Sequence, residues 1–140
     1  MAVVKMKQIK STLHKAIVYI TDPSKTENGT LVSTNYTDAT DNPTLMTDAM
    51  LMSVDMTACG RRTGGVLAHH VVHSLSPEDS KHISSRQMHE MGIAFADEIT
   101  NGEYQYVIAT HVDRDHLHNH IIICTANTVT QHKIDRKSVV

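Results

Sequence analysis

The 140-residue sequence is poor in large aromatic side chains, with one Phe and no Trp. Ile, Val, Leu and Met must therefore fill the core that one domain of this size, with 40% hydrophobic residues, can bury. A long hydrophobic run is also missing. No stretch approaches the roughly 20 apolar residues of a membrane-spanning helix, and the N-terminal MAVVKMKQIK lacks the apolar segment of a signal peptide. We therefore expect a cytoplasmic protein without a membrane segment.

Cysteine and net charge are low as well. Cys59 and Cys124 lie far apart without the spacing of metal-binding cysteines, which predicts reduced thiols in the cytoplasm. The formal net charge of -2 does not indicate a nucleic-acid-binding protein. However, residues 1–20 contain lysines and no acidic residue, so a local basic patch can still meet a phosphate backbone. Such a cluster is more often simply a solvated surface.

Hydrophobic periodicity predicts both strands and helices. Strands are expected at residues 3–9, 66–75, 104–112 and 116–126, and helices at residues 12–21, 45–58 and 84–99. Residues 22–44 are rich in Asp, Asn, Thr, Ser and Gly and predict a long loop. These elements predict a single α/β (α+β) domain with a central, mainly antiparallel sheet and helices packed against one face.

Apolar residues at helical spacing predict which side of each helix is buried. The expected faces are Leu13, Ala16, Ile17 and Ile20 in the first helix, Met46, Met50 and Met52 in the second, and Met88, Met91, Phe95 and Ile99 in the third.

The segment 111–120, HVDRDHLHNH, concentrates histidines and aspartates. Because side chains alternate along a strand, His118 and His120 should share one face, and the hairpin should bring His111 beside them. Three imidazoles from two adjacent strands form a pocket for a divalent transition metal such as Zn, Mn, Ni or Co, with positions left open for a ligand. We therefore predict that His111, His118 and His120 bind a metal.

Two residues near these histidines have alternative roles. His116 lies at the edge of the loop, where it can support a ligand histidine or face DNA as readily as bind the metal. Asp113 can orient a ligand histidine through its free ring N–H, or serve only as a turn residue.

A three-histidine metal site polarises an oxyanion such as phosphate, which either water or a side chain then attacks. Tyr19 is the candidate side chain, since it lies off the expected apolar face of its helix and shares a stripe with Lys15. Lys15 and Lys25 can attract an anionic phosphate. On the pattern alone, a packing role for Tyr19 is the commoner alternative.

Three motifs together resemble the relaxases, the mobilisation nucleases of conjugative plasmids and integrative elements within the HUH endonuclease superfamily. THVDRDHLHNHIII resembles their metal motif, and KAIVYITDPSKT, with Tyr19, resembles their nucleophile motif. LAHHVVHSLSPEDS resembles their middle motif, in which Ser74 helps to hold DNA near the cleavage point. The motifs occur in the family's order, within about residues 4–134. Leu75 departs from the family, which usually has Phe after this Ser and uses it for base stacking.

The resemblance implies an HUH-relaxase-like palm and strand-specific nicking of DNA at an origin of transfer. Tyr19 attacks a phosphodiester, forms a 5'-phosphotyrosine and frees a 3'-OH, so that the strand can later be rejoined. The metal, which is Mn, Mg, Zn or Ni, neutralises charge on the phosphate. Asp113 or His116 is expected to help remove the proton of a phenol, whose ordinary pKa is about 10.

The resemblance also implies partners and a larger protein. The expected partners are single-stranded origin-of-transfer DNA, accessory relaxosome proteins and a coupling protein, in a bacterial cytoplasm. Ser74, Lys15 and Lys25 are the expected DNA contacts. Residues 1–140 are expected to be the catalytic domain at the N-terminus of a longer chain.

Two other functions fit the same residues. One is a metal-dependent hydrolase that uses activated water, although H-x-D-x2-H-x-H is not the usual H-x-H-x-D-H of metallo-β-lactamases. The other is a module that binds an origin without cutting it. Among the other tyrosines, Tyr104 and Tyr106 should point away from His111, and Tyr36 lies in the polar loop.

Overall fold

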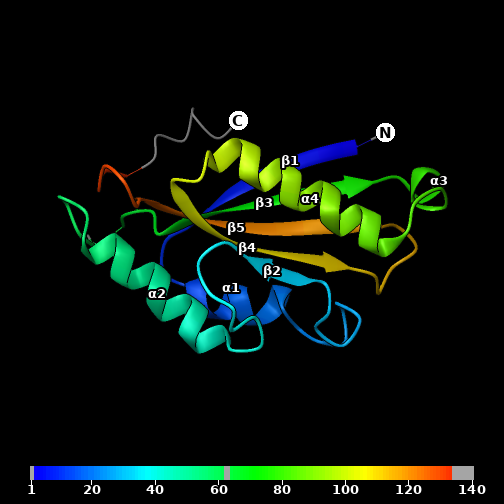
Figure 1. Cartoon of the computed structure of the whole chain (residues 1–140), viewed down its shortest axis with the longest axis horizontal. Helices are drawn as coiled ribbons and strands as arrows, with labels where there is room; N and C mark the ends of the chain where they lie inside the picture. Colours follow the sequence, from blue (N-terminus) through cyan, green and yellow to red (C-terminus); the bar gives the residue numbers. More distant parts are fainter. Residues whose placement is uncertain (1, 62–63, 134–140) are drawn as a thin grey trace.

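The histidine hairpin lies in the middle of a five-stranded antiparallel sheet with the strand order β1-β3-β5-β4-β2 (Figure 1). The computed structural model describes residues 2–61 and 64–133. The strands are β1 Ala2–Ile9, β2 Val32–Thr34, β3 Ala68–Leu75, β4 Tyr104–His111 and β5 His118–Asn127. The predicted strands are therefore present, and the last three are neighbours as expected.

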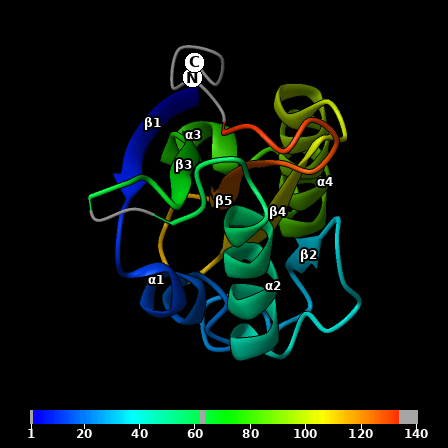
Figure 2. The same ribbon diagram turned by 90° about the vertical axis from the view of Figure 1, so that its left-hand side faces the viewer.

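Helices cover both faces of this sheet, so the prediction of one covered face is wrong (Figure 2). The helices are α1 Leu13–Ile20, α2 Pro43–Asp55, the short α3 Pro77–Ser80 and α4 Ser85–Thr100. α1 and α2 pack on the face that carries Ile122 and Cys124, whereas α4 packs on the face that carries Ile121 and Ile123. The reason is visible in β5, which is buried at every position. A strand covered on both sides has apolar residues in a continuous run rather than in alternation.

The residues of α2 that are buried differ in part from the predicted ones. Met46, Met50 and Val54 are fully buried, but Met52 is 64% exposed. Residues four apart lie on one side of a helix, whereas residue 52 is rotated by about 200° from residue 50. The helix begins earlier than predicted, because Pro43 occupies its first turn and the Asn42 side chain accepts a hydrogen bond from the Leu45 N–H.

The buried side of α4 is lined by small residues as well as by Met88. Gly92 and Ala96 are buried, whereas Met91 is 44% exposed and Phe95 and Ile99 are only partly buried. The helix approaches the sheet so closely that a Cβ at Gly92 would collide with the side chains of Ile108 and Asn119. The predicted methionine-rich face is therefore shifted toward these small residues.

The polar segment 22–44 is more ordered than a plain loop. It contains β2, in which Val32 pairs with Ala109 of β4. Its first part is tied to the end of β4, because the Val112 N–H donates to the Lys25 carbonyl and the Thr110 N–H donates to the Leu31 carbonyl. These bonds hold the segment beside His111.

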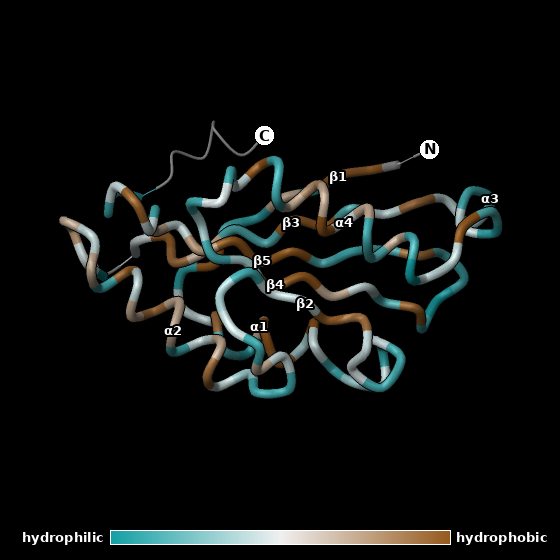
Figure 3. The backbone as a smooth tube through the Cα atoms, viewed as in Figure 1, coloured by the Kyte–Doolittle hydropathy of each residue, from teal (hydrophilic) through white to brown (hydrophobic). Residues whose placement is uncertain are grey.

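Hydropathy changes along β5, as Figure 3 shows. The strand begins with the hydrophilic His118-Asn119-His120 and continues with three isoleucines. The polar site therefore lies at one end of the hairpin, and the core lies behind it. No helix within the described ranges 2–61 and 64–133 is long and apolar enough to cross a membrane.

Candidate active site

His111, His118 and His120 converge on one face of the sheet, as predicted. His111 is directly opposite His118 in the β4–β5 register, and His120 is opposite Ala109. The centroids of the three rings lie 4.2 to 5.1 Å apart. One possible ligand atom from each ring lies within 4.8 Å of the others, and all three side chains are buried. We call these residues the histidine triad.

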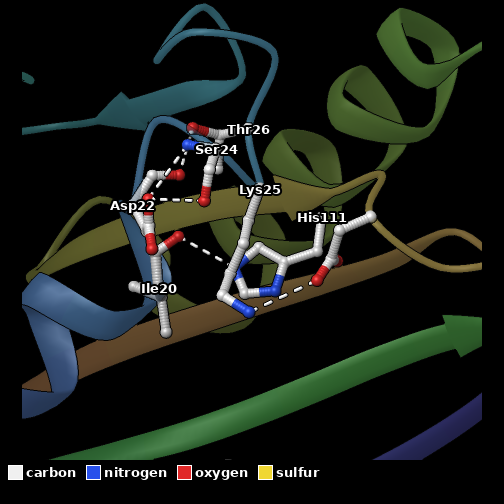
Figure 4. A network of polar contacts seen from close by, with 7 residues as sticks. Ile20, Asp22, Ser24, Lys25, Thr26 and His111 are labelled. Atoms are coloured by element: carbon white, nitrogen blue, oxygen red, sulfur yellow. Dashed lines mark hydrogen bonds and ion pairs between the residues drawn. The ribbon is translucent and has the colours of Figure 1, made fainter.

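The nitrogens of the triad fit a divalent cation. His118 Nδ1 and His120 Nε2 are buried without a hydrogen-bond partner among the described residues. The Nε2–H of His111 donates to the Ile20 carbonyl at 2.9 Å, since a carbonyl can only accept, and this leaves the Nδ1 lone pair of His111 available (Figure 4). Buried nitrogens without partners are costly unless a ligand satisfies them.

Burial keeps the triad neutral. It is the main reason why the pKa of His120 falls to about 2, and the nearby His111 and His70 add to the effect. Burial also lowers the pKa values of His111 and His118. Because a metal binds neutral imidazole, protons do not compete strongly for these nitrogens near neutral pH.

Tyr19 lies against this triad. Its ring stands edge-on to two of the three imidazoles, with centroids 5.9 Å from His111 and 6.1 Å from His120. The buried face of α1 is Leu13, Ile17 and Ile20, so Tyr19 projects from another side and is 49% exposed. Helix packing thus presents the phenol to both the histidines and the solvent.

Lys25 joins Tyr19 to Asp113. Its Nζ lies 5.1 Å from the centroid of the Tyr19 ring and 3.3 Å from Asp113 Oδ2. Burial is the largest single effect and opposes ionisation of Asp113, but the hydrogen bond and charge of Lys25, the backbone N–H of Asp113 and the charge of His111 together hold the pKa of Asp113 below its usual value. The side-chain hydrogen-bond partner of Asp113 is therefore Lys25 and not a ring of the triad, which was one of the two roles that the sequence left open for this residue.

The other predicted site residues surround the triad on neighbouring elements. Ser74 is opposite His118 in the β3–β5 register and therefore shares its face. The ring of His116 lies 5.3 Å from that of His118, while its Nδ1 contacts Asp115 Oδ1 at 3.0 Å. Lys15 is exposed on α1, one turn before Tyr19.

The remaining tyrosines are engaged elsewhere. The hydroxyl of Tyr36 donates to the Met46 carbonyl at 2.8 Å, and burial raises the pKa of Tyr36 above its usual value. Tyr36 is therefore held in place, although it lies in the segment predicted as a polar loop. Tyr106 donates to Asp97 on the α4 side of the sheet, and Tyr104 packs on that side too, as predicted.

His70 is a member of the site that the sequence analysis missed. Its Nε2 lies 2.8 Å from His120 Nδ1, and both rings are buried. Burial is the main reason why the pKa of His70 falls to about 4, followed by the charge of Lys7. The alternation of strand side chains could have indicated this residue, because 70, 72 and 74 share one face of β3.

A cavity of about 430 Å³ opens beside Tyr19. It is lined by residues from the end of α1 and from the segment that follows, including Val18, Asp22, Pro23, Asp41 and Pro43. The phenol therefore borders a space large enough for part of a ligand.

The chain is similar in sequence to known relaxases. The profile of the family described as "Relaxase: MobA/VirD2-like, nuclease domain" matches residues 19–138. The chain is 45% identical over 78 residues to the group II intron-interrupted relaxase LtrB of Lactococcus lactis subsp. cremoris, with 56% of this chain and 14% of LtrB covered. It is 38% identical over 72 residues to protein rlx of Staphylococcus aureus, with 51% of this chain and 21% of that protein covered.

A solved structure shares the fold. The MobM relaxase domain, in a Mn-bound crystal structure with pMV158 oriT DNA, superposes with a TM-score of 0.66 at 15% identity. The match covers 99% of this chain and 76% of the MobM domain. The chain spans only a small part of its curated relatives, 14% of LtrB and 21% of rlx, but the family profile extends over most of its residues. It therefore belongs to the MobA/VirD2-like relaxase nuclease-domain family.

Proposed function

We propose that this domain nicks one DNA strand at an origin of transfer, with Tyr19 as the nucleophile and a divalent metal bound by His111, His118 and His120. The observation that carries the proposal is the position of Tyr19, whose ring lies about equally far from the rings of His111 and His120, at 5.9 and 6.1 Å. We infer from this position that the phenol oxygen can reach a single phosphate held at the triad. Such alignment of nucleophile and phosphate supplies much of the catalytic effect.

The proposed reaction is a transesterification. The Tyr19 oxygen attacks phosphorus, the bond from phosphorus to the 3' oxygen breaks, and that oxygen leaves as a 3'-OH once it is protonated. The product is a 5'-phosphotyrosine, so no phosphodiester energy is lost to water. When bound, the metal neutralises charge on the phosphate.

Residues around Tyr19 have separate tasks in this reaction. Lys25, held by Asp113 over the tyrosine ring, attracts the phosphate and stabilises the charge that builds up during attack. His116, which is half-exposed beside His118, is the better candidate to accept the phenol proton, because the Asp113 carboxylate is already paired with Lys25. Lys15, one turn from Tyr19 and exposed, lies where it can contact the DNA backbone.

The path of the DNA is proposed to follow the same face of the sheet toward β1. Ser74 lies beside His118, and the exposed Lys5 and Lys7 of β1 pair with Val72 and His70 of β3. Opposite residues of paired strands share a face, so both lysines belong to the face of the triad. A local basic edge of this kind can hold a phosphate backbone although the net charge is -2.

The relatives support the choice of metal and partner. The MobM structure contains Mn and oriT DNA. We accordingly propose Mn as the first ion to test here and single-stranded origin DNA as the substrate. We also propose accessory relaxosome proteins and a coupling protein as partners, and a bacterial cytoplasm as the location.

Covalent capture tests this function against its alternatives. The full-length protein is incubated with Mn and a labelled single-stranded origin oligonucleotide, and the products are separated under denaturing conditions. We expect a protein–DNA adduct together with a free 3'-OH fragment. Cleavage without an adduct would show hydrolysis by water, and binding without cleavage would show an origin-binding module; either result contradicts the proposal.

A further inference from the structure

We propose that His70 positions His120 for metal binding by accepting the hydrogen of its ring nitrogen, and that this contact sets the metal affinity of the triad. The inference rests on the metal site of the proposed function. It concerns a residue outside the predicted ligands, and it can be tested without DNA.

The contact joins two neighbouring strands diagonally. In the β3–β5 register, His70 is opposite Ile122, and the residue opposite His120 is Val72. His70 and His120 are thus diagonal neighbours on the same face, two residues apart in the register. Long side chains can span this separation. The two ring centroids lie 5.1 Å apart, and the Nε2-to-Nδ1 distance is 2.8 Å. Both residues are buried, so water cannot easily replace this hydrogen bond.

The chemistry fixes the direction of the bond. The other nitrogen of His120, Nε2, is buried without a partner among the described residues and is therefore the atom available to the metal. A metal needs a lone pair on Nε2, so Nδ1 of His120 must carry the hydrogen. His70 Nε2 then accepts this hydrogen. The bond selects the tautomer of His120 that can bind a metal and holds the plane of its ring.

Two rings of the triad are thus held from outside. The Ile20 carbonyl at the end of α1 accepts from His111, and His70 on β3 accepts from His120. Loss of His70 would leave a buried N–H without an acceptor and allow the ring to turn or change tautomer. The loss of such a supporting partner typically weakens metal binding by about 10- to 100-fold.

The test is a calorimetric titration of Mn²⁺ into the 140-residue chain. His70→Phe keeps a ring of similar size but has no acceptor, and His70→Leu removes the acceptor with less volume. His70→Gln offers an oxygen acceptor near the position of Nε2. The matched control is His73→Leu, on the same strand but packed against Phe95 on the α4 side. Thermal unfolding of each metal-free variant accompanies the titration.

We expect His70→Phe and His70→Leu to weaken Mn²⁺ binding by about 10- to 100-fold, while His70→Gln recovers most of the loss and His73→Leu binds like the wild type. A wild-type chain that binds no Mn²⁺ would remove the metal site of the proposed function itself. A wild-type chain that binds Mn²⁺, with Phe and Leu variants that bind equally well, would overturn the role of His70 alone. A His70→Gln variant that binds Mn²⁺ as weakly as His70→Phe would also contradict the role of His70, because a hydrogen-bond acceptor at this position would then not be enough to restore the metal affinity.

Discussion

Ile20 and His111 are joined by a 2.9 Å hydrogen bond in which the imidazole Nε2–H donates to the helix carbonyl. The bond links the last residue of α1 to the last residue of β4. Carbonyls at the end of a helix lack partners within the helix, so this acceptor is available. Tyr19, the preceding residue, is thereby fixed beside the triad. The proposed nucleophile and the histidine triad are held by a helix and a strand, and their distance does not depend on a mobile loop.

The four histidines of the hairpin should contribute unequally to metal binding. We expect His118→Ala or His120→Ala to abolish tight Mn²⁺ binding, since two imidazoles hold a divalent ion poorly. The loss should exceed the roughly 10- to 100-fold typical of a supporting residue. His116→Ala should cost much less, because His116 lies outside the group whose ligand atoms converge. Calorimetric titration ranks the variants, and equal losses at all four histidines would show that the ligands are wrongly chosen.

The lysines of β1 should contribute to DNA affinity through phosphate contacts. We expect Lys5→Gln combined with Lys7→Gln to reduce the slope of log affinity against log salt by about 1.4, at roughly 0.7 for each phosphate contact on a single strand. Fluorescence anisotropy with a labelled single strand at several salt concentrations measures this slope. Lys81→Gln, an exposed lysine beyond α3, is the matched control and should leave the slope unchanged. An unchanged slope in the double variant would place the DNA elsewhere.

Gly92→Ala should destabilise the domain although alanine favours a helix by about 1 kcal/mol. The added Cβ would meet Ile108 and Asn119, and the Asn119 side chain donates to the Met88 carbonyl and accepts from Thr110. Overpacking of this kind typically costs about 1–3 kcal/mol, so after the gain in helix propensity we expect a net loss of up to about 2 kcal/mol in the free energy of unfolding. Urea denaturation measures it, with Ala94→Ser on the exposed side of α4 as the control. A stabilised Gly92→Ala variant would contradict the close approach.

His89 should make the stability depend on pH. Its ring is fully buried between Ser33 and Thr110, and burial lowers the pKa of His89 from 6.5 to about 4. The folded state therefore resists protonation that the unfolded state accepts. The contribution of neutral His89 to the free energy of unfolding is fully present above pH 6.5 and is lost as the pH decreases toward 4. This contribution is on the order of 3 kcal/mol.

Urea denaturation between pH 7 and pH 4 measures this effect. We expect His89→Gln to show a smaller loss of stability over that range, and His82→Gln, an exposed histidine, to behave like the wild type. If His89→Gln loses as much stability as the wild type, other histidines account for the pH dependence.

Local patterns were sufficient to predict the hairpin and the triad. The alternation of side chains along a strand placed His118 and His120 on one face. The short connection between the two strands then placed His111 opposite His118. The same counting correctly directed Tyr104 and Tyr106 to the other face. Such features depend on neighbours in the sequence, whose geometry is fixed by the backbone.

Features that depend on tertiary contacts were not predicted. The bond between His70 and His120 requires the register of β3 against β5, which pairs residues about 50 positions apart. The partner of Asp113 is Lys25, from a segment that appeared to be only a loop. Met91 on α4 is apolar but exposed, because the close approach of α4 to the sheet selects Gly92 and Ala96 for the buried side. Met52 on α2 is exposed because it is rotated by about 200° from the buried Met50. Hydrophobic type alone does not reveal how closely two elements approach.

The most direct test of the account is the identity of the residue that becomes linked to DNA. The full-length protein is reacted with Mn and a single-stranded origin oligonucleotide, and the adduct is digested and mapped by mass spectrometry. We expect the phosphotyrosine at Tyr19. Tyr19→Phe, which removes only the hydroxyl, should retain metal and DNA binding and form no adduct, whereas Tyr36→Phe should still form one. A 5'-phosphotyrosine adduct formed by Tyr19→Phe at the wild-type rate would contradict the account.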